Sequence, residues 1–182
     1  LLIGCTERKS SSSNLNVENK NTTETDTLLR DKMLRAAFEH FRNKDFQKYY
    51  QISKEIEKNS KKANDTSGIV SANVNLGYYF LNNFTKDSAY FYLSKAEKLS
   101  ALTKEKPHLE TIIQYKSSIL WSENNFAEAE QQAIKAVAIA NLKNNKEVVY
   151  NSYLTIANSL VGMNNFTDAI FYYNEAMEIS ES

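Results

Sequence analysis

The sequence repeats itself with a period of 40 residues. Three eight-residue segments that begin and end with alanine align without gaps, at residues 89–96, 129–136 and 169–176. The two alanines of each segment are seven residues apart, so on a helix they share one face, and their small side chains let that face approach a neighbouring helix closely. This self-similarity predicts an array of stacked helical hairpins.

Each of these segments follows a turn that reads Asn-Asn-Phe, at residues 82–84, 124–126 and 164–166. The second and third turns occupy the same register of the repeat, whereas the first is displaced by two residues. Asn can accept hydrogen bonds from the first N–H groups of a helix, and Glu128 and Asp168 suit the positive end of the helix dipole. Each turn is therefore predicted to start the second helix of a hairpin.

The composition agrees with an all-α fold. Hydrophobic residues make up 42% of the chain, and 4 Gly and 1 Pro are too few for the many turns of a β-sandwich or barrel. Lys+Arg and Asp+Glu both number 22, so the chain lacks the basic surface that binding to a phosphate backbone requires. We expect no nucleic acid to be bound by this segment.

The pattern resembles the tetratricopeptide-repeat (TPR) family. The family places Leu-Gly and an aromatic residue on the first helix of each repeat, and aromatic residues with two alanines on the second. Residues 76–96, which begin with Leu-Gly, match one repeat, and residues 153–176 match another. The middle repeat is weaker, with Lys116-Ser117 in place of Leu-Gly. The resemblance implies an all-α, right-handed α–α superhelix of about four helical hairpins.

The period departs from the family's usual repeat of about 34 residues. We expect the additional residues to lengthen the second helix of each unit and the connection after it. The period alone would also admit HEAT-like repeats, but the Leu-Gly and paired-alanine pattern favours TPR-like units.

The first residues are similar to the start of a bacterial lipoprotein. Residues 2–5 read Leu-Ile-Gly-Cys, which resembles the lipobox, where a small residue precedes a cysteine that is lipidated after signal-peptide cleavage. This resemblance implies that residues 1–5 end a signal peptide and that Cys5 is the lipidation site. The alternative is a buried apolar segment in which the cysteine is a small hydrophobic residue.

A polar segment of low complexity separates this start from the helical repeats. Residues 6–27 have almost nothing to bury and are predicted to form a flexible tether. Apolar residues recur at helical spacing across residues 28–182, which are predicted to form the TPR-like domain. Together these features predict an extracytoplasmic protein of the cell envelope, lipid-anchored to a membrane through Cys5.

The polar residues do not assemble into a catalytic pattern. The chain has two histidines, His40 and His108, and a single cysteine, which are too few for a Cys/His or Ser-His-Asp site or a zinc site. Its four glycines stand singly, so no phosphate-binding loop is present. We therefore predict that the chain is not an enzyme and holds neither metal nor cofactor.

The resemblance also implies a binding groove. In TPR arrays the first helices line a concave face that holds a peptide or helix. The family's groove positions fall here on Val74, Asn75, Tyr78, Gln114, Tyr115, Ser118, Trp121, Leu154, Thr155 and Asn158. None of them is Lys or Arg, so we do not predict the family's clamp around a terminal carboxylate. An amide-rich and aromatic groove favours a neutral or extended peptide with Trp121 as the anchor. The alternative is that Trp121 and the tyrosines only pack between repeats.

Two functions are compatible with these features. The first is a protein- or peptide-binding module of a lipoprotein. The second follows from residues 87–96, which also look like the TPR sensor regions of bacterial membrane-bound regulators. On that hypothesis the chain is the ligand-sensing part of a transcriptional regulator or sensor kinase whose effector domain lies beyond residue 182.

Overall fold

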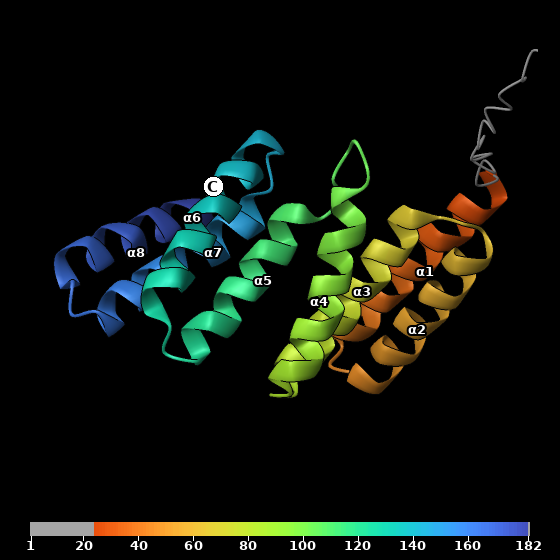
Figure 1. Cartoon of the computed structure of the whole chain (residues 1–182), viewed down its shortest axis with the longest axis horizontal. Helices are drawn as coiled ribbons and strands as arrows, with labels where there is room; N and C mark the ends of the chain where they lie inside the picture. The colour runs from red at the N-terminus through yellow and green to blue at the C-terminus, as the bar shows by residue number, and fades with distance from the viewer. Residues whose placement is uncertain (1–23, 182) are drawn as a thin grey trace, which may run out of the picture.

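The computed structural model describes residues 24–181, which form eight helices packed in chain order (Figure 1). The helices are α1 (Glu24–Arg42), α2 (Phe46–Lys62), α3 (Thr66–Asn82), α4 (Lys86–Ala101), α5 (Leu109–Ser122), α6 (Phe126–Leu142), α7 (Lys146–Gly162) and α8 (Phe166–Glu181). Across residues 24–181 there is no strand, and no helix has the length and apolar character needed to span a membrane. Residues 24–27, predicted as the end of the tether, belong to α1. Cys5 and the rest of the tether lie outside the described residues.

Consecutive helices pair into four hairpins, α1–α2, α3–α4, α5–α6 and α7–α8. We call α1, α3, α5 and α7 the first helices, and α2, α4, α6 and α8 the second helices. First helices of successive hairpins also touch one another, α3 with α5 and α5 with α7, so they form one continuous face of the array. The predicted all-α fold of four hairpins is confirmed.

The 40-residue period comes from the length of the helices. The second helices begin at Phe46, Lys86, Phe126 and Phe166, each 40 residues after the one before. Helices α2, α3, α6 and α7 each have 17 residues and are followed by a turn of three. The additional residues therefore lengthen both helices of a unit. The prediction of a longer connection after each second helix is wrong for α2 and α6 and correct only for α4, which is followed by residues 102–108.

The three-residue turns share one backbone geometry. The middle residue of each has a positive φ, at Lys44, Asn64, Phe84, Asn124, Asn144 and Asn164. In the last of them Asn165 N donates to the carbonyl of Leu160 over 2.8 Å, which closes the end of α7 as in a Schellman motif. Asn adopts the left-handed conformation more readily than most residues because its short polar side chain can form hydrogen bonds with the nearby backbone.

Capping differs from turn to turn. The side chains of Asp45, Asp65 and Asn145 accept a backbone N–H from the first turn of the next helix. Asn125 precedes α6 as predicted, but its side-chain amide instead donates to the Glu128 carboxylate over 2.7 Å.

The paired alanines of α4, α6 and α8 lie where these helices pack against their neighbours. Ala129 and Ala136 are completely buried, and Ala169 and Ala176 are 1% exposed. Their burial confirms the close helix packing that the repeat predicts. On the facing first helices, small residues serve the same purpose, and Gly77 of α3 lies directly against Leu93 of α4.

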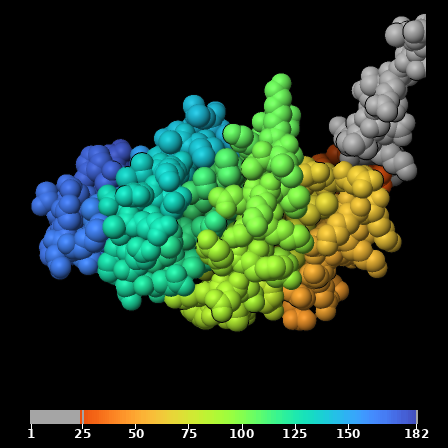
Figure 2. Space-filling model, viewed as in Figure 1, coloured from red at the N-terminus to blue at the C-terminus, as the bar shows by residue number. Residues whose placement is uncertain are grey.

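One connection breaks the regularity. Residues 102–108 link α4 to α5 and project from the surface (Figure 2), and α5 has only 14 residues. As a result α4 and α5 pack less extensively than any other consecutive pair of the described helices. We call this place the α4–α5 joint.

Candidate functional site

The predicted groove residues lie on the first-helix face and line two cavities. The N-terminal hollow, of about 360 Å³, is bounded mainly by α1, α3 and α5, and the C-terminal hollow, of about 330 Å³, by α5, α7 and the α3–α4 turn. Both volumes lie at the lower end of the range in which small ligands and peptide side chains bind. The N-terminal hollow receives Val74, Asn75, Tyr78 and Tyr115, and the C-terminal hollow receives Gln114, Ser118, Trp121, Leu154, Thr155 and Asn158.

Trp121 is the exposed aromatic side chain that α5 contributes to the C-terminal hollow. It is 40% exposed at the end of the helix, and Leu154 of α7 lies across the same cavity. An indole held this way offers a large apolar surface and a ring N–H donor to a ligand. Its position therefore suits the anchor role predicted for it.

Amide and hydroxyl groups surround this indole. Gln114 Nε2 donates to Ser118 Oγ over 3.1 Å, and Asn158 Oδ1 accepts a hydrogen bond of 2.6 Å from Tyr173 of α8. Asn151 adds another side-chain amide. These contacts hold Gln114 and Asn158 in place and leave each with further donor or acceptor capacity. The hollow can thus satisfy the backbone polar groups of a bound peptide.

The charge of both hollows is low. Lys86 is the single Lys or Arg among the described residues that line them, and its Nζ donates to the carbonyl of Ser122 over 2.8 Å. Glu147 is the carboxylate at the N-terminal hollow. Neither hollow has the cluster of cations that would bind a terminal carboxylate or a phosphate.

Phe84 also lines the C-terminal hollow, although it is not among the predicted groove residues. It is the middle residue of the α3–α4 turn, where its φ is 56°. The residue is 91% exposed and lies at the edge of the cavity. Four of the other five turns have Asn at this position, whereas a bulky side chain is unfavourable there. The signal was present in the sequence: the two-residue displacement of Asn82-Asn83-Phe84 places Phe in the turn, not at the start of the next helix.

The tyrosines of the N-terminal hollow pack between repeats. The rings of Tyr78 and Tyr115 stack with their centroids 4.9 Å apart and an interplanar angle of 23°, and Phe41 of α1 lies 5.0 Å from Tyr78. Burial raises the pKa of Tyr115, so its hydroxyl stays neutral. This aromatic row joins α1, α3 and α5 across the α4–α5 joint.

His108 lies at the edge of the N-terminal hollow, in the connection before α5. Its Nε2 is 2.9 Å from the Ser71 hydroxyl on α3. This contact joins the connection to α3. Among residues 24–181, no group of three or more His, Cys, Asp or Glu side chains is placed to hold a metal ion.

A comparison with protein families finds one match. The model described as a tetratricopeptide repeat matches residues 150–182, which cover most of α7 and all of α8. No curated protein matches the chain. With its consecutive hairpins, the described part of the chain is a TPR-like α-solenoid. Repeats of this kind typically form non-catalytic scaffolds that bind proteins or peptides, so the fold is that of a protein-interaction module.

Proposed function

We propose that this chain is the peptide-binding module of a bacterial cell-envelope lipoprotein, and that the C-terminal hollow holds an extended, uncharged segment of its partner. The observation that carries the proposal is the pair of exposed aromatic residues, Trp121 and Phe84, in one cavity. Exposed aromatic side chains in a concave site are typical anchors of protein recognition.

The backbone conformation of Phe84 supports a role in binding. A left-handed φ costs a bulky residue on the order of 1 kcal/mol, and the exposed ring recovers little of this cost by burial within the chain. Because contacts within the chain do not offset this conformational cost, we attribute the presence of Phe84 to an interaction with another molecule. Contact between the Phe84 ring and a bound ligand would provide it.

The polar lining supports an extended segment. Side-chain amides from two neighbouring helices, Gln114 of α5 with Asn151 and Asn158 of α7, supply donors and acceptors beside the aromatic anchor. An extended peptide has free backbone N–H and C=O groups that need such partners, whereas a helix satisfies its own. The low charge of the hollow favours uncharged side chains at the anchor position.

The experiment uses the intrinsic fluorescence of Trp121, the only tryptophan of the chain. Peptides without tryptophan are selected from a displayed random library on the 182-residue chain and titrated against it. We expect a saturable shift of the Trp121 emission. Phe84→Asn is expected to weaken binding about tenfold, and Trp121→Ala, followed by calorimetry, by more.

The matched control is Phe171→Ala, which removes a comparably exposed ring from α8 (56% exposed) outside both hollows. It is expected to leave the affinity unchanged. Selected peptides that bind Trp121→Ala and Phe84→Asn as tightly as the unmodified chain would show that this hollow is not the site.

The lipid anchor at Cys5 and the envelope location rest on the Leu-Ile-Gly-Cys sequence and the polar residues that follow it. More than one acyl chain would hold such a protein stably on a membrane. In cells that carry the full precursor, Cys5→Ser is expected to move the protein from the membrane fraction to the supernatant. An unchanged distribution would exclude the anchor. The regulator hypothesis uses the same hollow as its ligand-sensing site and is distinguished by mapping both termini of the native protein.

A further inference from the structure

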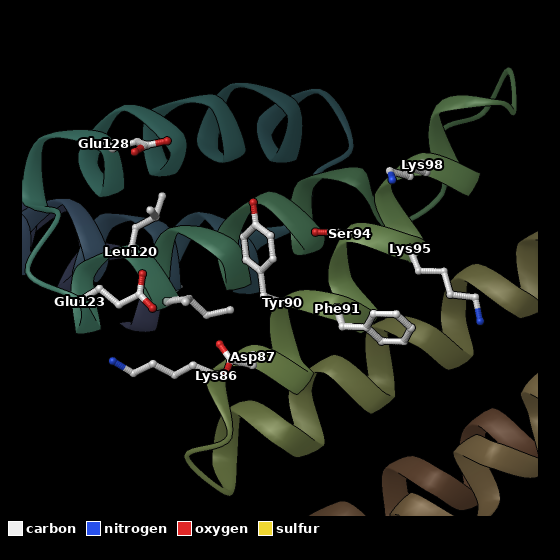
Figure 3. Close-up of a pocket in the computed structure, with 11 residues that line it drawn as sticks. Lys86, Asp87, Tyr90, Phe91, Ser94, Lys95, Lys98, Leu120, Glu123 and Glu128 are labelled. Atoms are coloured by element: carbon white, nitrogen blue, oxygen red, sulfur yellow. The ribbon is translucent and has the colours of Figure 1, made fainter.

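A cavity of about 860 Å³ lies at the α4–α5 joint, on the side of the second helices (Figure 3). Helix α4 forms one wall, α5 provides the apolar residues Ile119 and Leu120, and Glu128 of α6 lies at the opposite rim. Tyr90 and Phe91 of α4 are 49% and 63% exposed here. We call this cavity the joint groove.

The joint groove exists because α5 does not cover α4 fully. At the equivalent position one repeat earlier, Tyr50 of α2 is half-buried and its ring lies 4.8 Å from the ring of Tyr79 on α3. Tyr90 is more exposed, and its ring is approached by Lys116 Nζ of α5 at 4.8 Å. The groove thus leaves open an apolar surface that a neighbouring helix covers in the preceding hairpin.

The two ends of the groove carry opposite charge. Asp87, Glu123 and Glu128 lie toward the N-terminal end of α4, whereas Lys98 lies at the other end (Figure 3). The remaining two lysines are engaged within the chain, since Lys86 donates to the Ser122 carbonyl and Lys95 pairs with Glu57 on α2. A complementary ligand therefore needs a cationic end, an apolar middle and an anionic end.

The outer face of α1 has this arrangement. Its residues recur at alternating intervals of four and three, the spacing of a helix face that packs against another helix. They are Glu24, Leu28, Asp31, Arg35, Phe38 and Arg42. The acidic residues lie in the first half and the basic residues in the second, while Leu28 and Phe38 are 53% and 58% exposed. Ala37, on another side of α1, is buried against α2, whereas Phe38 lies at the edge of the N-terminal hollow.

We propose that the joint groove of one copy of the chain binds α1 of a second copy, antiparallel to α4. In this orientation Arg35 and Arg42 meet the acidic end at Asp87 and Glu123, and Glu24 meets Lys98. Leu28 and Phe38 cover Tyr90 and Leu120. The helix dipoles of α1 and α4 then also oppose each other favourably.

The contact is heterologous, because the groove and the outer face of α1 are different surfaces of one molecule. Each copy therefore has one groove and one outer α1 face. Successive copies would assemble into an open series, unless the rotation between neighbouring copies closes the series into a ring. The contact includes Phe38, which also lines the N-terminal hollow, and the joint groove shares Lys86 with the C-terminal hollow. Trp121 and Phe84, the proposed peptide anchors, are not part of it.

Sedimentation velocity of the 182-residue chain over the micromolar to millimolar range tests the proposal. We expect concentration-dependent association that weakens with added salt, because exposed charges contribute to it. Arg42→Glu on α1 and Glu123→Lys in the groove are each expected to weaken self-association about tenfold or more. Glu178→Lys, the same kind of charge reversal on exposed α8, is the matched control and is expected to have no such effect.

A mixture of the two single variants gives the sharpest outcome. The Arg42→Glu chain retains an intact groove and the Glu123→Lys chain retains an intact α1. The two reversed charges also complement each other, so the mixture should associate more strongly than either variant alone. Circular dichroism melting verifies that both variants are folded. Three outcomes would each overturn the proposal. The unmodified chain could remain monomeric at every concentration, or Glu123→Lys could leave its association unchanged, as expected for a symmetric α1–α1 dimer. The third is a mixture of the two variants that does not associate.

Discussion

Glu57 of α2 and Lys95 of α4 form an ion pair between two successive second helices, with Oε1 and Nζ 2.6 Å apart. Lys54 and Lys61 also contact the same buried carboxylate, at 2.9 and 2.8 Å. Burial alone would raise the pKa of Glu57, but the hydrogen bonds from the three lysines outweigh it and lower the pKa to about 2. A single carboxylate thereby joins the first two hairpins.

The stability of the fold should depend on the ionisation of Glu57. Because its folded-state pKa lies below the ordinary value of 4.5, the ionised group stabilises the fold above pH 4.5, and this contribution is lost as the pH falls toward about 2. We expect Glu57→Gln to cost on the order of 2 kcal/mol at neutral pH. Urea unfolding of both proteins, followed by circular dichroism, measures the difference at each pH. A gap between them that stays constant down to pH 2 would contradict the assignment.

Gly77 should not tolerate even a methyl group. A Cβ at Gly77 would lie 2.7 Å from Cγ and Cδ2 of Leu93, which is completely buried and has little room to move. We expect Gly77→Ala to destabilise the chain by about 1–3 kcal/mol despite the better helix propensity of alanine. The comparison is Gly162→Ala, where the Cβ would meet the ring of Phe126 at 2.6 Å near the surface, and the ring can turn away. Equal losses in thermal melts of the two variants would argue against the rigid contact at Leu93.

The paired alanines predict a contrast within one helix. Ala129 of α6 is completely buried, whereas Ala138 of the same helix is exposed. Ala129→Glu would bury a charge between two helices and is expected to cost several kcal/mol, about 3 or more. Ala138→Glu should stay within about 0.5 kcal/mol of the unmodified chain. Chemical denaturation of both variants decides the matter, and a stable Ala129→Glu protein would show that the helices do not pack through this face.

Phe84 is expected to lower the stability of the chain. Phe84→Asn would place in the α3–α4 turn the residue that four other turns use at a positive φ, and we expect a gain of about 1 kcal/mol. The reciprocal change, Asn124→Phe in the α5–α6 turn, should lose a similar amount. Thermal unfolding of the two variants measures whether Phe84→Asn raises the stability and Asn124→Phe lowers it. A loss of stability in Phe84→Asn would mean that the ring packs within the chain.

The sequence was sufficient to predict the parts of the fold that depend on periodicity. The spacing of the alanines placed Ala129 and Ala169 in helix contacts, and the Asn-Asn-Phe turns placed the starts of α6 and α8. These features are local, since side-chain size and helical period act within one or two turns of a helix. The distribution of the extra residues was wrong because polar segments near a helix end are compatible with either helix or loop.

The geometry of the site could be predicted only in part. The groove positions share the first-helix face because the helical period places them there, but the stacking of Tyr78 on Tyr115 joins two hairpins and depends on side-chain conformation. The conformation of Phe84 depends on a backbone angle that residue type alone would disfavour. The joint groove depends on the orientation of α5 relative to α4, which residues 102–108 determine. The composition of this connection does not predict that orientation.

The regular spacing of the helices also limits how such an array can change in length during evolution. A helix and its turn together take 20 residues at α2, α3, α6 and α7. An insertion or deletion of one such unit would exchange first and second helices for the rest of the array, so that the side chains of the first-helix face would lie on the opposite side. A gain or loss of 40 residues leaves both faces intact. The unit that can be duplicated or removed is therefore the pair of helices, and the three-residue turns, which share one backbone geometry, provide junctions for such a change.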